Sequence, residues 1–143
     1  MIKLLRPFLI IVSLFIVTIP ISCNNDDDSN SDCENMVCTF EFRTIVISIK
    51  DQNQNAVALD SFKVINIENN DDMTILLSAS GFEMAQQFGQ YPLLDDGSLE
   101  VNQELEVQFK GFINNQEVIS SNYTVSTDCC HINLVSGTLE LTL

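Results

Sequence analysis

Residues 104–125, ELEVQFKGFINNQEVISSNYTV, decide the fold. Apolar side chains alternate with polar ones in residues 104–113, at Leu105, Val107, Phe109, Gly111 and Ile113, as in a strand with one buried face. Asn114-Asn115 suits a two-residue hairpin, because asparagine tolerates a positive φ, and residues 118–125 then form the returning strand. The stretch predicts an antiparallel hairpin at the centre of the folded body.

Shorter strand patterns lie on both sides of this hairpin. Residues 39–50 and 61–68 are rich in β-branched and aromatic side chains, and a change of phase near Arg43-Thr44 predicts a bulge or a strand that switches sheets. Residues 80–87 allow a short helix at most, and the tail after Cys130 adds short strands. About seven strands in about 106 residues predict an all-β protein, an immunoglobulin-like antiparallel β-sandwich.

The first 23 residues, MIKLLRPFLIIVSLFIVTIPISC, read as an export signal. Lys3 and Arg6 precede an apolar run over residues 8–19, which is shorter than the roughly 20 residues that a membrane-spanning helix needs. Pro20 then interrupts the run before Ser22 and Cys23. The pattern predicts a segment that is cut after export rather than a transmembrane anchor.

Ser22-Cys23 resembles the lipobox of bacterial lipoproteins. The resemblance implies that residues 1–22 are a signal peptide and that Cys23 becomes the acylated N-terminus. The acidic run at residues 26–28 is similar to the signal that sends some Bacteroidota-type lipoproteins to the cell surface, although it also suits a plain spacer. The implied location is the outer membrane, lipid-anchored and facing the cell surface, with a periplasm-facing protein as the alternative.

The mature chain divides into a tether and one domain. Residues 23–37 are expected to form the lipidated cysteine and a disordered tether, because adjacent carboxylates repel each other and bury nothing. Residues 38–143 are expected to form the sandwich domain. Its opening, CTFEFRT, and its closing DCCHI are similar to small uncharacterised lipoproteins of flavobacterial type, and the segment from Ile47 to Val64 resembles the opening of carboxypeptidase-regulatory-like and transthyretin-like sandwiches.

Charge restricts the partners of the mature protein. Four basic residues face 20 acidic ones once residues 1–22 are removed, a formal charge of −16. Binding of nucleic acid requires lysines and arginines that this chain lacks. We therefore expect attachment to the membrane through the lipid anchor, an envelope protein or a glycan as partner, and no nucleic acid.

No catalytic motif stands out in the domain. Asp51-x-Asn53-x-Asn55 copies the start of a calcium loop without the glycine and glutamate that such a loop needs, so it predicts a turn. The acidic pairs Asp71-Asp72 and Asp95-Asp96 are expected in solvated turns, with calcium binding as the alternative. We predict a structural or binding module with no catalysis, no cofactor and no metal.

His131 carries the alternative function. It is the only histidine, and we expect it on a strand in a surface or edge role. A small envelope metal-binding protein or a hydrolase would have to use His131 with nearby cysteines or acidic residues.

Four cysteines remain after acylation of Cys23, namely Cys33, Cys38, Cys129 and Cys130. An even number in an exported domain predicts two disulfides. A bridge between Cys129 and Cys130 would be strained, because adjacent Cα atoms lie only about 3.8 Å apart. The first two cysteines should therefore each bond one of the last two, in either of two crossed pairings, with a zinc site that includes His131 as the rival.

Overall fold

The computed structural model describes residue 33 and residues 35–143. The expected signal peptide, the lipidation site Cys23 and the acidic run at residues 26–28 lie outside the described residues. Within the described chain, no helix is long and apolar enough to cross a bilayer.

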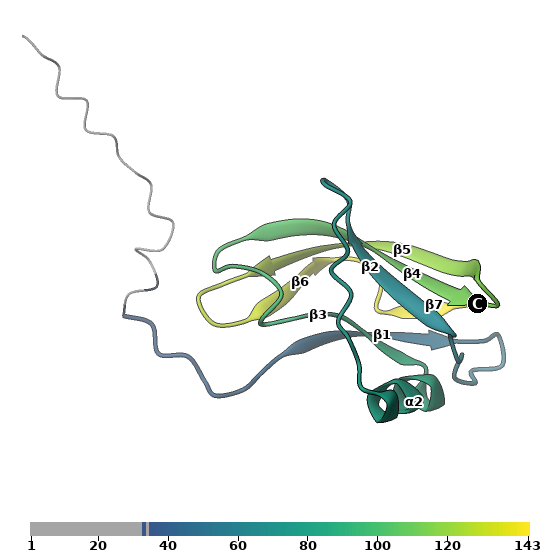
Figure 1. Ribbon diagram of the computed structural model, residues 1–143. Helices are drawn as coiled ribbons and strands as arrows, with labels where there is room; N and C mark the ends of the chain where they lie inside the picture. The colour runs from purple at the N-terminus through teal and green to yellow at the C-terminus, as the bar shows by residue number, and fades with distance from the viewer. Residues whose placement is uncertain (1–32, 34) are drawn as a thin grey trace, which may run out of the picture.

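Over residues 35–143, seven strands form two sheets, and one short helix lies between the second and third strands (Figure 1). The elements are β1 (Thr44–Lys50), β2 (Ser61–Asn66), α2 (Ala79–Phe88), β3 (Gln90–Asp95), β4 (Glu104–Ile113), β5 (Gln116–Thr127), β6 (Ile132–Ser136) and β7 (Glu140–Thr142). One sheet has the order β3-β1-β7 and the other has the order β2-β4-β5-β6. The predicted all-β body of about seven strands is confirmed, and its two sheets pack as a sandwich.

The central hairpin forms as predicted. Strand β4 has the expected bounds and pairs with β5 in antiparallel register. Asn114 and Asn115 have φ angles of 51° and 62°, the left-handed conformation that a two-residue hairpin requires. The alternating side chains from Leu105 to Phe109 point into the body, so the local pattern alone fixed this part of the fold.

The core lies between the sheets and draws on both. Its fully buried side chains include Ile47, Ile49, Leu59, Val64, Tyr91, Leu93, Leu94, Val107, Phe109, Tyr123 and Val125. Tyr91 is one of two tyrosines in this core, and its hydroxyl accepts a hydrogen bond from the Leu59 amide at 2.7 Å and donates one to the Val57 carbonyl at 2.9 Å. This hydroxyl satisfies one backbone group each of the buried residues Val57 and Leu59, which lie outside the strands.

Helix α2 covers one end of the first sheet. Ser78 caps its start by accepting a hydrogen bond from the Gly81 amide, and Gly89 ends it in the left-handed conformation with φ of 63°. A Cβ at Gly89 would lie 2.5 Å from the Ile49 carbonyl oxygen, so only glycine fits between the helix and β1. The sequence allowed a short helix at most over residues 80–87, and the helix that forms there has ten residues, Ala79–Phe88.

Three features differ from the sequence expectations. The strand expected from residue 39 begins only at Thr44, although β1 does contain an irregularity of the predicted kind, a break in register between Ile45 and Val46. Strand β7 pairs with β1 in parallel over three residues, so the sandwich is not wholly antiparallel. Strand β3, which no pattern predicted, forms an edge of the first sheet.

Candidate functional site

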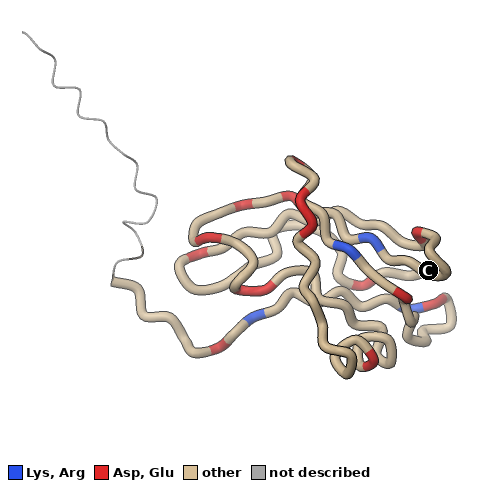
Figure 2. Tube along the Cα trace, viewed as in Figure 1, with Lys and Arg blue, Asp and Glu red and all other residues tan. Residues whose placement is uncertain are grey.

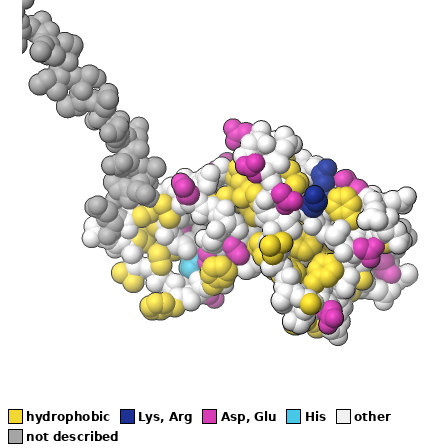
Figure 3. Space-filling view, viewed as in Figure 1, with side chains coloured by type: hydrophobic (Ala, Val, Ile, Leu, Met, Phe, Trp, Pro, Cys, Tyr) yellow, Lys and Arg dark blue, Asp and Glu magenta, His cyan; other side chains and the backbone are white. Residues whose placement is uncertain are grey.

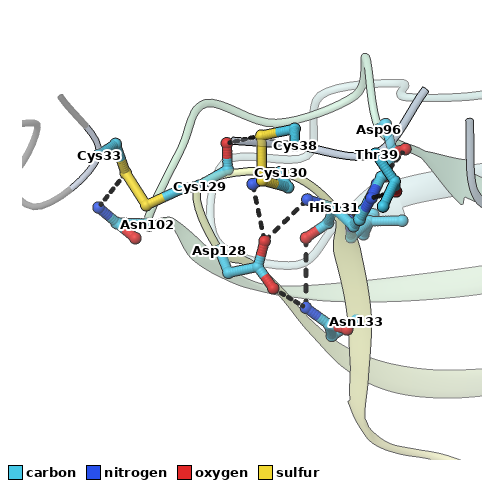
Figure 4. Close-up of a disulfide and its surroundings, with 11 residues drawn as sticks. Cys33, Cys38, Thr39, Asp96, Asn102, Asp128, Cys129, Cys130, His131 and Asn133 are labelled. Atoms are coloured by element: carbon cyan, nitrogen blue, oxygen red, sulfur yellow. Dashed lines mark hydrogen bonds and ion pairs between the residues drawn. A yellow bond between two sulfur atoms is a disulfide. The ribbon is translucent and has the colours of Figure 1, made fainter. Parts of the chain in front are cut away.

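Two disulfides join the N-terminal segment to the turn between β5 and β6. Cys33 bonds Cys129 and Cys38 bonds Cys130, as Figure 4 shows. This is one of the two crossed pairings that the sequence predicted, and it leaves no cysteine of the described chain for a zinc site. The Cys33–Cys129 disulfide therefore ties residue 33, which lies inside the range expected for the tether, to the domain.

A chain of hydrogen bonds lies directly beside the second disulfide. The His131 ring joins Asp96 through Nδ1 at 2.9 Å and Thr39 through Nε2 at 2.9 Å (Figure 4). An ionised carboxylate only accepts hydrogen bonds, so Nδ1–H donates to Asp96, and the Thr39 hydroxyl is the hydrogen-bond partner of Nε2. The two disulfides together with Thr39, Asp96 and His131 form what we call the clasp.

His131 occupies a buried position, which corrects the expected surface or edge role. Its side chain is 9% exposed and that of Asp96 is 10% exposed, and it precedes β6 rather than lying within it. A buried imidazole requires partners for both ring nitrogens, and Thr39 and Asp96 supply them.

Asp96 is the electrostatic centre of the clasp. Its carboxylate accepts hydrogen bonds from the Arg43 amide at 2.7 Å, the Ile132 amide at 2.7 Å and the His131 ring. Burial acts to raise the pKa of Asp96, but the Arg43 amide, the His131 ring and the Ile132 amide outweigh it and hold the pKa below its usual value. The ionised form thus joins three segments that are distant in sequence.

Asp128 shapes the turn that carries the two C-terminal cysteines. Its carboxylate accepts hydrogen bonds from the Cys130 amide at 2.7 Å and the His131 amide at 2.8 Å. These amides, Cys130 first, lower the pKa of Asp128. The turn therefore presents Cys129 and Cys130 to different partners while it directs the ring of His131 towards Asp96.

Carboxylates in the acidic turns predicted from the sequence accept hydrogen bonds from backbone amides of the same turns. Asp51 accepts hydrogen bonds from the Asn53 and Asn55 amides, which confirms the predicted turn. Asp72 accepts from the Thr74 amide and lies 3.7 Å from the Lys63 ammonium. In the part of the chain that the structure describes, no group of three or more histidine, cysteine, aspartate or glutamate side chains is arranged to hold a metal ion.

An apolar groove lies between α2 and the first sheet. It has a volume of about 200 Å³ and is lined mainly by Val46 of β1, Leu77 just before α2, Met84 and Phe88 of α2, and Pro92 of β3. Met84 is 59% exposed and Phe88 is 54% exposed. Gln90 pairs with Ser48 whereas Asp95 pairs with Thr44, so α2 and the clasp lie at opposite ends of β1.

Comparison with known proteins gives no relative. No family model matches the chain, and no curated protein or solved structure shows significant similarity to it. The features that bear on function are therefore the clasp, the groove and the surface charge. That charge is mostly negative, with acidic residues in many loops and strands and few basic ones between them (Figure 2).

Sequence reasoning missed Thr39 and Asp96 as partners of His131. Asp96 was assigned to a solvated turn because Asp-Asp-Gly is a strong turn signal, and the turn does form, with the Gly97 amide donating to Asp95. Thr39 was assigned to a strand. The only hint in the sequence was position, since Thr39 follows Cys38 and His131 follows Cys130, and a bridge between these cysteines brings the two side chains together.

Proposed function

We propose that this protein is a lipid-anchored protein of the cell envelope whose sandwich serves as a binding or structural module without catalysis. The anchor is Cys23, the membrane is the outer membrane, and the body faces the cell surface, with the periplasmic face as the alternative. The finer fold assignment that we propose is an immunoglobulin-like sandwich, which the two-sheet arrangement and the hairpin connections favour.

The observation that carries the proposal is the pair of disulfides in the clasp. Disulfides persist in compartments outside the cytoplasm, which agrees with an exported chain. Both bridges fasten the stretch from Cys33 to Cys38, at the N-terminal end of the described chain, to the turn between β5 and β6. Such a connection suits a domain that is held at a defined point above a membrane.

The groove between α2 and the first sheet supports a protein partner. Its lining is aliphatic and aromatic, whereas a glycan site needs polar groups and stacking platforms, and the chain contains no tryptophan. Contiguous apolar patches on a protein surface often mark interaction sites. The groove lies away from the clasp, so a tethered body can offer it to a neighbouring envelope protein.

The anchor is tested by Cys23→Ala. We expect the variant to remain as a longer precursor that carries no acyl chain, because the signal is cut only before an acylated cysteine in this class of protein. Gel mobility and mass spectrometry of the N-terminal peptide measure the result. A Cys23→Ala protein that is cut and membrane-bound like the wild type would refute the anchor.

The groove is tested by the double variant Met84→Ser/Phe88→Ser. We expect mild crosslinking on whole cells to recover its protein neighbours at several-fold lower yield than with the wild type, because two apolar contacts of the groove are lost. Val135→Ser is the matched control, since Val135 on β6 is also 54% exposed and lies outside the groove. Equal loss of neighbours with the control, or no loss with either, would contradict a role for the groove.

A hydrolase is the second candidate, and the hydrogen-bond chain through Thr39, His131 and Asp96 favours it. A hydroxyl, an imidazole and a carboxylate in this order can activate the hydroxyl as a nucleophile. Thr39 is exposed, so a substrate could reach it. Turnover of an activated ester that is lost in Thr39→Val and in His131→Gln, while both variants stay folded, would establish this function instead.

A further inference from the structure

The segment just after the first disulfide exposes four apolar side chains in seven residues. Val37 is 91% exposed and Phe40 is fully exposed, and Met36 and Phe42 are more than half exposed. We call these four residues the apolar edge. Figure 3 shows apolar side chains gathered at one end of the molecule, next to the histidine.

The exposure of these side chains is fixed by the clasp. Met36 and Val37 lie between the Cys33 and Cys38 disulfides. Phe40 and Phe42 lie between Thr39, which bonds His131, and Arg43, whose amide bonds Asp96 and whose carbonyl accepts from the Asp96 amide at 3.1 Å. The chain on both sides of each pair is held, so the edge cannot fold back onto the core to hide its apolar surface.

The edge carries no unpaired charge of its own. Glu41 and Arg43 are its only charged neighbours within residues 36–43, and Arg43 Nη2 lies 3.9 Å from Glu41 Oε2. The mature chain as a whole carries a formal charge of −16. The apolar edge is therefore a neutral exception on an acidic protein.

The position of the edge along the chain identifies its occupant, on the premise of the anchor under Proposed function. Cys33 follows Cys23 by ten residues, so even a fully extended chain places the clasp within about 35 Å of the acylated cysteine. The clasp end of the body is therefore the end nearest to the anchor along the chain, while the groove end is free to lie further away. Apolar and aromatic side chains next to a lipid surface enter the boundary between headgroups and acyl chains.

We propose that the apolar edge inserts into the lipid bilayer, with Phe40, Phe42, Met36 and Val37 at the boundary between the headgroups and the acyl chains. Together with the acyl chains, the edge then provides a second contact, and the body stands on the membrane at a fixed angle with its groove turned outward. Because the surface of the mature protein is acidic, the lipid that fits is zwitterionic, such as phosphatidylethanolamine or phosphatidylcholine, rather than anionic.

The absence of tryptophan from the chain makes a direct test available. Phe40→Trp, Phe42→Trp and the control Phe88→Trp each introduce a single fluorescent reporter at an exposed phenylalanine. The acylated proteins are reconstituted into phosphatidylcholine vesicles whose acyl chains carry bromine. We expect the reporters at positions 40 and 42 to emit at shorter wavelength and to be quenched several-fold more than the reporter at position 88.

Further arms separate the alternatives. Acylated protein that floats with the vesicles while the reporters at 40 and 88 are quenched equally would overturn the edge and leave the anchor intact. A chain recovered without acyl groups would overturn the anchor, and the edge is then tested on a chain that begins at Asn24 and is held to nickel-chelating lipid by an N-terminal hexahistidine. A blue shift of the Phe40→Trp protein that grows with concentration in the absence of vesicles would show a second copy as the occupant and overturn the lipid contact.

Discussion

Removing both disulfides should cost about 2 kcal/mol more stability than twice the loss of one. The Cys38–Cys130 bridge closes a loop of 92 residues, for which the chain-entropy model gives about 4.7 kcal/mol of stabilisation. Once that bridge is present, Cys33–Cys129 closes a ring of only about eight residues, made of residues 33–38 and 129–130, and adds about 2.5 kcal/mol. The same nesting applies when the order is reversed, because the other bridge spans 96 residues.

We therefore expect Cys33→Ser/Cys129→Ser and Cys38→Ser/Cys130→Ser each to lower the free energy of unfolding by about 2.5 kcal/mol, and the quadruple variant to lower it by about 7 kcal/mol. A loss of the latter size approaches the whole stability of an ordinary domain, about 5–15 kcal/mol. Urea denaturation of the mature chain without acyl groups measures all three. Additive losses, or a quadruple variant as stable as either double variant, would contradict the nested arrangement.

The central hairpin was accessible from sequence because its signals are local. Alternation in β4 and two asparagines at the turn specify both strands and their register without reference to the rest of the chain. Strand β3 has no such signal. Its residues from Tyr91 to Leu94 are all buried and do not alternate, and Pro92 argues against a strand, although it is tolerated here because β3 is an edge strand opposite the break in the register of β1.

The start of β1 shows a different limit. Phe40 and Phe42 have strong strand propensity and the right spacing, yet the chain leaves the sheet before Thr44 because disulfides and the carboxylate of Asp96 hold it there. Tertiary bonds of this kind override local preference. The sequence predicted the crossed pattern of the bridges, but the choice between the two pairings depends on where the β5–β6 turn points each cysteine, which no local rule contains.

The site around His131 was the least accessible from sequence. Its two partners lie 35 and 92 residues away, and each was explained adequately by another role. A single histidine carries no spacing pattern. What the sequence could provide was the adjacency of Thr39 to Cys38 and of His131 to Cys130, which becomes a contact only after the disulfide pairing is known.

The second large effect is expected from Asp96→Ala. The variant deprives two backbone amides and the His131 ring of their shared acceptor, and of these donors the Ile132 amide and the His131 ring are poorly solvated. Hydrogen bonds to a charged acceptor contribute more than neutral ones, and buried donors without a partner are costly, so we expect a loss of about 2–4 kcal/mol. Glu83→Gln on α2 is the control, because Glu83 is exposed and distant in sequence, and it should change stability little.

The pH dependence of this loss distinguishes the charge of Asp96 from its mere volume. The folded pKa of Asp96 is lowered from 3.8, so the unfolded chain binds a proton more readily than the folded one. The stabilisation from the carboxylate is therefore fully present above about pH 4 and is lost as the pH falls through the lower, folded pKa. The difference in unfolding free energy between wild type and Asp96→Ala should accordingly stay constant from neutral pH down to about pH 4 and shrink in more acidic solution. A difference that is the same at every pH would mean that packing alone, and not the ionised carboxylate, joins the N-terminal segment to β6.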